Sequence, residues 1–204
     1  MQTKVYQKIL EVPYHSQFLE VHDNFWNIRS CGAACIKMIC DYQAVPSESI
    51  QEIMEYAKDN SGYDINNGFI HDFAVHYFKK RDMFSHRVDM GFLSLDEEGK
   101  KKDNFNLIIQ SINEGNPVMA SIAKQTLEQR KYHLVVVVGY KYILADTEFQ
   151  DVDSNRIISH IVYHEPESTD EERGQYRECE ARVFFDAFTG KAIFASRNNF
   201  NLAF

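Results

Sequence analysis

The feature that most constrains the fold is an uninterrupted apolar run, Leu134-Val135-Val136-Val137-Val138, which directly follows His133. β-Branched side chains favour strands, and a strand with no alternation of apolar and polar residues is typical of one buried on both faces. The run therefore predicts a central strand covered on both sides, with His133 fixed at its start.

The elements predicted around this strand are mostly helices in the first half of the chain and mostly strands in the second half. Apolar residues recur at spacings of three and four from Ala33 to Tyr42, which indicates a helix with one buried face. Three further helices are predicted: from Ser49, where Ser49 and Glu52 can form a capping box, to Asp59; from His71 to Lys80; and from Asp103 or Asn104 to Gly115. Strands are predicted over residues 4–13, 118–122, 156–163 and 192–195, a turn at Asn66-Asn67-Gly68 and a charged surface loop over 170–180. Helices first and strands later indicate an α+β fold, with the N-terminal helices packed on one side of an antiparallel sheet.

Composition limits the function classes. A chain of 204 residues predicts a single domain spanning 1–204. The net charge of −8, without a basic stripe, argues against nucleic-acid binding. No apolar run approaches the roughly 20 residues that cross a bilayer, and no secretory signal is seen, so we expect no membrane partner and a cytoplasmic location. Three of the four cysteines crowd into one segment, which predicts reduced thiols. The sequence leaves the oligomeric state open.

Cys31 stands where a loop enters the first predicted helix, in Cys31-Gly32-Ala33-Ala34-Cys35. Free N–H groups and the positive end of the dipole at a helix N-terminus favour a thiolate, so Cys31 is a candidate nucleophile. The alternative is a small buried residue. Cys35 is expected to pack in the core, because side chains four apart on one helix point the same way and do not form a bridge.

A nucleophilic cysteine needs a base, and His133 at the start of the valine-rich strand is the candidate. The spacings of the other histidines match no zinc motif. Asp151-Val152-Asp153-Ser154-Asn155 is similar to the start of a calcium loop, but Arg156 stands where that loop needs glycine. We therefore predict no metal and no cofactor.

Several stretches together resemble a known family. Gln17, followed by Trp26-Asn27-Ile28-Arg29-Ser30-Cys31-Gly32-Ala33-Ala34-Cys35, is similar to the active-site segment of the bacteriocin-processing, double-glycine-leader peptidases and their stand-alone relatives. Gly68-Phe69-Ile70-His71-Asp72, Gly115-Asn116-Pro117-Val118 and His133-Leu134-Val135-Val136-Val137-Val138-Gly139-Tyr140 follow in the family's order. The resemblance implies a papain-like cysteine peptidase fold.

The resemblance also implies residue roles. Cys31 would attack the carbonyl, His133 would take and return its proton, and Gln17 with the Cys31 backbone N–H would form the oxyanion hole. The chain departs from the family in two places. The separation between Gln17 and Cys31 is longer than in the shortest family versions, and Glu165-Pro166 stands where the family often has Asp-Pro.

The acid that orients His133 is the least constrained residue. Asp146, Glu165 and Asp186 all follow His133. In a papain-like sheet the acid lies on the strand antiparallel to the histidine strand, and Glu165 ends the predicted strand 156–163, before a proline that stops the ladder. We therefore predict Glu165, whereas Asp186 has the spacing of a solvated helix face.

These residues predict a thiol-dependent hydrolase that cleaves peptide (amide) bonds through an acyl-enzyme, with a peptide or protein as substrate. An acyltransferase using the same Cys31 and His133 and an inactive papain-like peptide-binding module are the alternatives. The sequence does not separate hydrolysis from acyl transfer.

Overall fold

The fold is built around one long strand, β6 (Arg130–Leu144), which contains the valine run. The structure is a computed structural model and describes residues 4–90, 96–125, 130–144 and 156–198. The first half of β6 pairs antiparallel with β5 (Val118–Gln125), and its second half pairs with β1 (Val5–Ile9) on one edge and β7 (Arg156–His164) on the other. Val135 to Val138 are completely buried, as the absence of alternation predicts.

The antiparallel sheet extends beyond β6 in both directions. Its order is β4-β9-β5-β6-β7-β8, with β1 beside β6 and off this path. The edge strands are β4 (Phe84–Val88) and β8 (Arg177–Glu180), and β9 (Phe188–Ser196) lies between β4 and β5. A separate two-stranded ribbon joins β2 (Tyr63–Asp64) to β3 (Gly68–Phe69). The predicted turn at residues 66–68 connects these two short strands.

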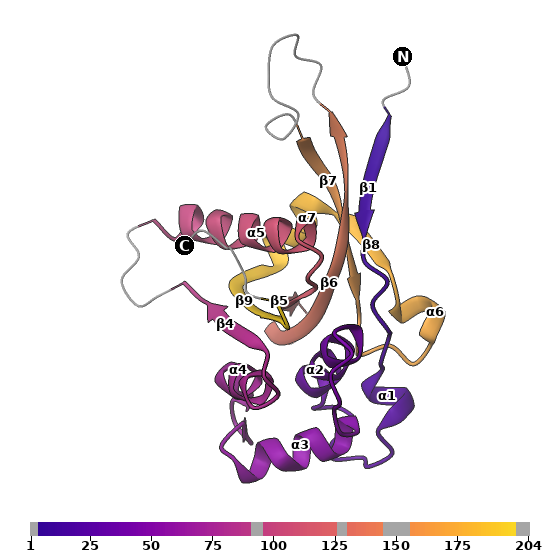
Figure 1. The fold of residues 1–204 in the computed structure, drawn as a ribbon, viewed down its shortest axis with the longest axis vertical. Helices are drawn as coiled ribbons and strands as arrows, with labels where there is room; N and C mark the ends of the chain where they lie inside the picture. Colours follow the sequence, from indigo (N-terminus) through magenta and orange to yellow (C-terminus); the bar gives the residue numbers. More distant parts are fainter. Residues whose placement is uncertain (1–3, 91–95, 126–129, 145–155, 199–204) are drawn as a thin grey trace.

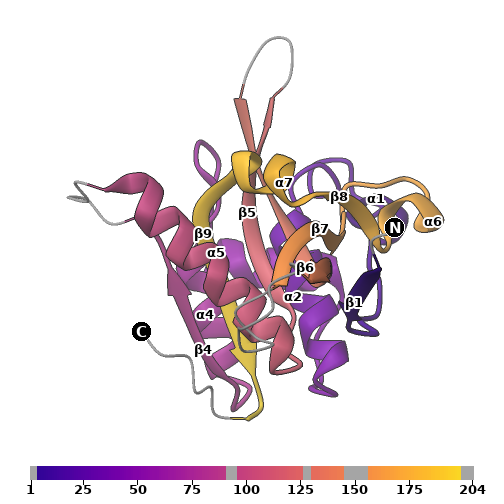
Figure 2. The same ribbon diagram turned by 90° about the horizontal axis from the view of Figure 1, so that it is seen from above.

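Helices cover both faces of the sheet. The helices α2 (Cys31–Tyr42), α3 (Ile50–Asp59) and α4 (His71–Lys79) lie below it in Figure 1, and α5 (Glu97–Asn113) lies above. Figure 2 gives the same arrangement from a second direction, with α5 in front of the strands and α2 and α4 behind them. Three short helices complete the fold: α1 (Gln17–Glu20), α6 (Glu171–Gly174) and α7 (Ala181–Ala187).

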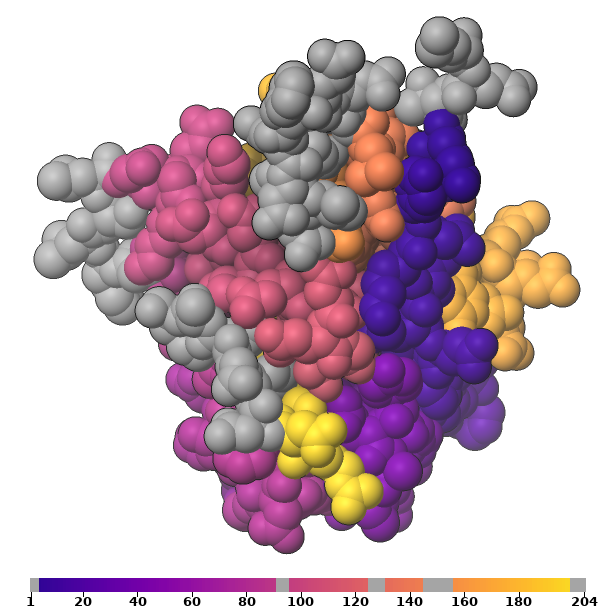
Figure 3. All heavy atoms as spheres, turned by 45° about the horizontal axis from the view of Figure 1, so that its top comes forward, coloured from indigo at the N-terminus to yellow at the C-terminus, as the bar shows by residue number. Residues whose placement is uncertain are grey.

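The predicted α+β class is confirmed, but the helices do not share one side of the sheet. A strand that is apolar on both faces needs cover on both, and α5 supplies the second layer. Figure 3 shows α5 and β1 on the surface of one face of the molecule. None of the helices in the described residues is long and apolar enough to cross a membrane.

Most predicted elements are present, but several differ in their bounds: the strand predicted over 4–13 spans only Val5–Ile9, and the one predicted over 192–195 begins at Phe188. The capping box at Ser49 and Glu52 forms as predicted at the start of α3. The helix predicted from Asp103 or Asn104 begins earlier, at Glu97, because Asp96 accepts a hydrogen bond from the Gly99 N–H and caps it. The segment predicted as a surface loop over 170–180 contains α6 and β8, and β4 was not predicted.

Candidate active site

Cys31 is the first residue of α2, whose packing against β6 fixes its position. No side chain caps this helix: the hydroxyl of Ser30 at the cap position donates instead to the Trp26 carbonyl, 2.7 Å away. The N–H groups of the first helical turn therefore carry no side-chain partner at the point where the thiol projects. Such a position stabilises an anion.

His133 lies on β6, opposite Ile122 of β5, and its side chain is 1% exposed. Glu165 directly follows β7, which pairs with β6 so that His164 lies opposite Val136. The chain leaving β7 therefore runs back along β6 towards His133. The His133 Nε2 atom lies 2.5 Å from the Glu165 Oε1 atom, and the Glu165 side chain is 4% exposed. The structure thus brings two of the predicted site residues into direct contact.

Cys31 and His133 line the same cleft and interact with each other. The second ring nitrogen of His133, Nδ1, has no hydrogen bond of regular geometry in the described residues, and Glu167 Oε2 lies 4.0 Å from it. Burial raises the pKa of the Cys31 thiol, but the interaction with His133 and the charge of the imidazole outweigh burial, so the pKa lies below its ordinary value. Burial lowers the pKa of His133, but interactions with Cys31 and Glu165 raise it to about 9. Each group therefore favours the charged form of the other.

A network of charges fixes Glu165. The Lys124 ammonium lies 2.9 Å from Glu165 Oε2 and 2.9 Å from Glu167 Oε2, and Lys131 lies 2.5 Å from Glu167 Oε1. The backbone N–H of Glu167 donates to Glu165 Oε1. Burial raises the pKa of Glu165, but its contacts with His133 and Lys124 lower it to about 2. The carboxylate is therefore ionised at neutral pH and acts only as an acceptor.

Sequence reasoning did not identify Lys124 or Glu167. The signal that could have found Glu167 is the sequence Glu165-Pro166-Glu167, because the proline ends the strand and leaves both acids at the same sheet edge. Lys124 and Lys131 lie opposite each other on β5 and β6, and only the register reveals that they reach these acids.

Gln17 does not line the cleft that contains Cys31 and His133. It is buried in α1, and its side-chain Nε2 donates to the Asn27 carbonyl, 2.6 Å away. Its Oε1 atom is buried without a hydrogen-bond partner in the described residues. The Nε2 group keeps a second hydrogen that no described acceptor occupies.

Of the other two acids considered for the third position, Asp186 lies on α7 with its side chain 64% exposed and 3.7 Å from Arg182. It does not approach His133, in agreement with the predicted solvated helix face. Asp146 and the segment 151–155 lie outside the described residues.

An open cleft reaches Cys31 and His133 between the helical layer and the sheet. Its walls include Phe69 of β3, Tyr132 and Leu134 of β6, and Thr189 of β9. A Cβ atom at Gly32 would lie 2.5 Å from the Phe69 ring, so only glycine at this position lets the aromatic ring pack beside Cys31.

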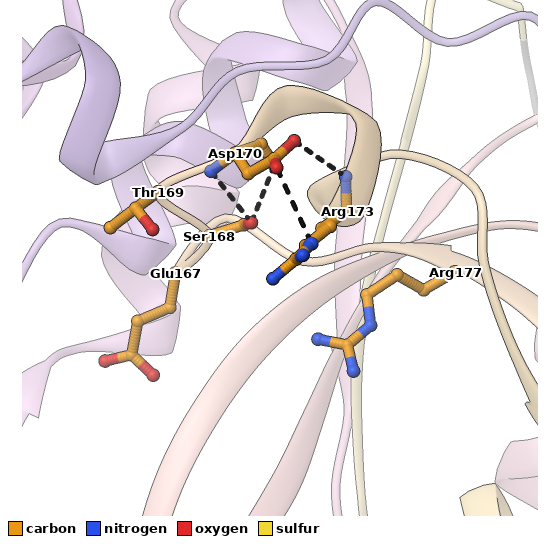
Figure 4. Close-up of a pocket in the computed structure, with 6 residues that line it drawn as sticks. All are labelled: Glu167, Ser168, Thr169, Asp170, Arg173 and Arg177. Carbon is orange, nitrogen blue, oxygen red and sulfur yellow. Dashed lines mark hydrogen bonds and ion pairs between the residues drawn. The ribbon is translucent and has the colours of Figure 1, made fainter.

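A second hollow lies behind the site, at the loop that follows Glu165. Figure 4 shows its residues: Asp170 contacts Ser168 and Arg173, while Glu167 and Arg177 project from neighbouring parts of the chain. Asp170 and Arg173 form an exposed ion pair, and no cysteine or histidine of the described residues lines this hollow.

A metal ion could be held only by the residues of this same site among the described groups. His133, Glu165 and Glu167 present ligand atoms within 4.8 Å of one another. The ammonium groups of Lys124 and Lys131 already contact the two carboxylates, so a cation would have to displace them. All four cysteines are free thiols, and Cys35 and Cys40 are completely buried.

Comparison with known proteins places the chain in a class of peptidases. The sequence profile described as the Peptidase C39-like family matches residues 9–184. The chain belongs to this family, as its resemblance to the leader peptidases predicted. Among solved structures it is similar to the peptidase domain of Streptococcus ComA, a bi-functional ABC transporter involved in a quorum-sensing pathway. That match has 14% identity and a TM-score of 0.49, and covers 84% of this chain and 93% of the other. No curated protein matches significantly.

Proposed function

We propose that this protein is a cysteine peptidase that cleaves amide bonds through an acyl-enzyme on Cys31. The observation that carries the proposal is that Cys31 and His133 line the same cleft while His133 contacts the buried carboxylate of Glu165. Cys31 itself begins a helix that no side chain caps. The membership of a peptidase family supports the same chemistry.

In the proposed first step, the Cys31 thiolate attacks the carbonyl carbon of the scissile bond, and the carbonyl electrons move to the oxygen. The backbone N–H of Cys31 at the uncapped end of α2 stabilises this oxyanion. The C–N bond then breaks, and the His133 Nδ1–H donates its proton to the leaving amine. The product of this step is a thioester on Cys31.

In the second step, water attacks the thioester and gives a proton to His133 Nδ1. The C–S bond breaks, which releases the carboxylic acid and restores the thiolate and imidazolium. Glu165 accepts a hydrogen bond from His133 Nε2 throughout, which fixes the tautomer and stabilises the imidazolium. Lys124 and Glu167 hold Glu165 in this orientation.

A peptide library digested in H₂¹⁸O tests the proposal. Wild type should generate new peptide ends that carry one ¹⁸O in the new carboxyl group, and Cys31→Ala should generate none. Incorporation of an added amine in place of ¹⁸O would identify the acyltransferase. If wild type gives no product and Cys31 alkylates like an ordinary thiol, the proposal is wrong and a peptide-binding module remains.

A further inference from the structure

The charged side chains that line the cleft around Cys31 are basic, whereas the protein as a whole is acidic. The protein has a net charge of −8, yet none of the described residues that line this cleft is acidic. Four basic side chains line it: Arg29, Arg87, Lys131 and Lys191. The acidic surface of the protein is therefore interrupted where a substrate would lie.

Three of the cleft residues form one cluster away from Cys31. His71 begins α4, Arg87 lies on β4 and Lys191 lies on β9, the strand that pairs with β4. Burial, together with the positive charges of Lys191 and Arg87, lowers the pKa of His71 to about 4. At neutral pH its ring is therefore uncharged and able to donate one hydrogen bond. No side chain caps α4, so the positive end of its dipole adds to the cluster.

The positive charge in this cluster is only partly compensated. Arg87 lies 2.9 Å from Asp72 and 3.3 Å from Asp89, neither of which lines the cleft. Lys191 is exposed and makes no ion pair with a carboxylate in the described residues. Of the described charged groups in the cluster, its ammonium is therefore the one without a carboxylate partner.

The sheet register fixes the distance of the cluster from the nucleophile. His133 lies opposite Ile122 on β5, and Ile122 lies opposite Phe188 on β9, so two strand spacings of about 5 Å separate His133 from β9. Ala192 on β9 lies opposite Ala120 on β5, because a bulge shifts the register between Ala120 and Ile122, and Lys191 directly precedes Ala192. Lys191 is therefore displaced from His133 by about one residue along the strands, at about 3.3 Å per residue. The separation from His133 is thus roughly 10 Å, which an extended peptide spans in about three residues.

We propose that Lys191, Arg87 and His71 form a subsite that binds a carboxylate of the peptide substrate, about three residues from the scissile bond. The inference rests on the proposed function, because it takes Cys31 as the point of cleavage. The carboxylate is either an acidic side chain or the free C-terminus of the peptide.

Quenched fluorescent peptides test the subsite. A peptide cleaved by wild type is made in paired versions with Glu or Gln at each position about two to four residues from the cleavage point, on both sides. One position should show a preference for Glu of about 10-fold in kcat/KM, as expected for a charge-assisted hydrogen bond. The preference should weaken in 1 M NaCl, because salt screens an exposed cation.

Variants then assign the preference to the cluster. In Lys191→Met the ratio of kcat/KM for the Glu and Gln peptides should fall to about 1, and Lys191→Glu should favour a peptide with Lys at that position. Lys102→Glu makes the same charge change on α5, on the opposite face of the sheet, and should leave the ratio unchanged. A Glu preference retained in Lys191→Glu, or no preference at any position in wild type, would overturn the inference.

The two sources of the carboxylate are separated by C-terminal amidation. A preference that survives amidation belongs to an acidic side chain, and one that disappears belongs to the free C-terminus. If no peptide is cleaved at all, the proposed function fails, but the subsite remains testable. Cys31→Ala should then bind a labelled Glu peptide about 10-fold more tightly than its Gln partner in fluorescence anisotropy, and equal affinities would exclude the subsite.

Discussion

His133 Nε2 and Glu165 Oε1 lie 2.5 Å apart, and both side chains are almost completely buried. The contact forms because β7 runs antiparallel to β6 and ends with His164 opposite Val136. Glu165, the next residue, therefore lies close to His133. With Nε2 occupied by Glu165, Nδ1 is the ring nitrogen available to Cys31. The chemistry proposed for the protein depends on this single orientation of the imidazole.

Replacing Glu165 should therefore impair catalysis more than folding. Glu165→Gln keeps the size of the side chain but offers an amide that can reverse the tautomer of His133, so we expect kcat to fall by about 10²- to 10⁴-fold. Peptide hydrolysis under saturating substrate measures this effect. Asp186→Asn, which neutralises an exposed carboxylate on α7, is the control and should retain activity. Near wild-type kcat in Glu165→Gln would remove Glu165 from the mechanism.

Cys31 and Cys35 should respond in opposite ways to replacement by alanine. Cys35 is completely buried, and burial raises the pKa of its thiol well above the ordinary value, so it is an inert core residue. Cys35→Ala should cost about 1 kcal/mol of unfolding free energy and keep activity. Cys31→Ala should abolish activity with little change in stability. Urea denaturation and peptide hydrolysis of both variants check the assignment, which is wrong if the two outcomes are exchanged.

Gln17 offers a test of the predicted oxyanion hole. If the second Nε2 hydrogen of Gln17 serves the oxyanion, Gln17→Ala should lower kcat by about 10²- to 10³-fold and change KM little. A role limited to its hydrogen bond with Asn27 predicts lower stability and an unchanged kcat at a temperature where the variant is folded. Asn27→Ala is a useful comparison, because it keeps the backbone carbonyl that Gln17 contacts.

The pair also predicts how stability depends on pH. The folded pKa of Glu165 is lowered to about 2, so its contribution is complete above the unfolded value of 4.5 and is lost as the pH falls towards 2. The folded pKa of His133 is raised to about 9, so its contribution is complete below 6.5 and is lost as the pH rises through 9. The difference in unfolding free energy between wild type and Glu165→Gln should therefore be largest between about pH 4.5 and 6.5. A difference independent of pH would contradict the buried ion pair.

Much of the fold could be predicted because local signals agree with the tertiary structure. The valine run of β6, the periodicity of α2 and the capping box of α3 each determine an element from neighbouring residues alone. The second helical layer could not be predicted in this way. The sequence of α5 shows only that it is a helix, and its position follows from the need to cover the far face of β6.

For the candidate site, too, some residues could be predicted from local sequence and others depend on the tertiary structure. Cys31 and His133 are marked by their positions at the starts of apolar elements, and Glu165 is marked by the proline after it. The contacts of Lys124 with Glu165 and Glu167 depend on the register of three strands and on the path of the chain after β7. Gln17 was predicted from a resemblance, and its contact with Asn27 depends on the loop between α1 and α2.

The central claim is that Cys31 is a thiolate paired with the His133 imidazolium, and its alkylation rate as a function of pH tests this claim most directly. With iodoacetamide, and with peptide mapping to follow Cys31 alone, the rate should rise through a transition well below the value of about 8.5 for a free thiol. The same measurement on His133→Ala should move the transition upward. A wild-type transition at or above 8.5 would contradict the pair and the mechanism built on it.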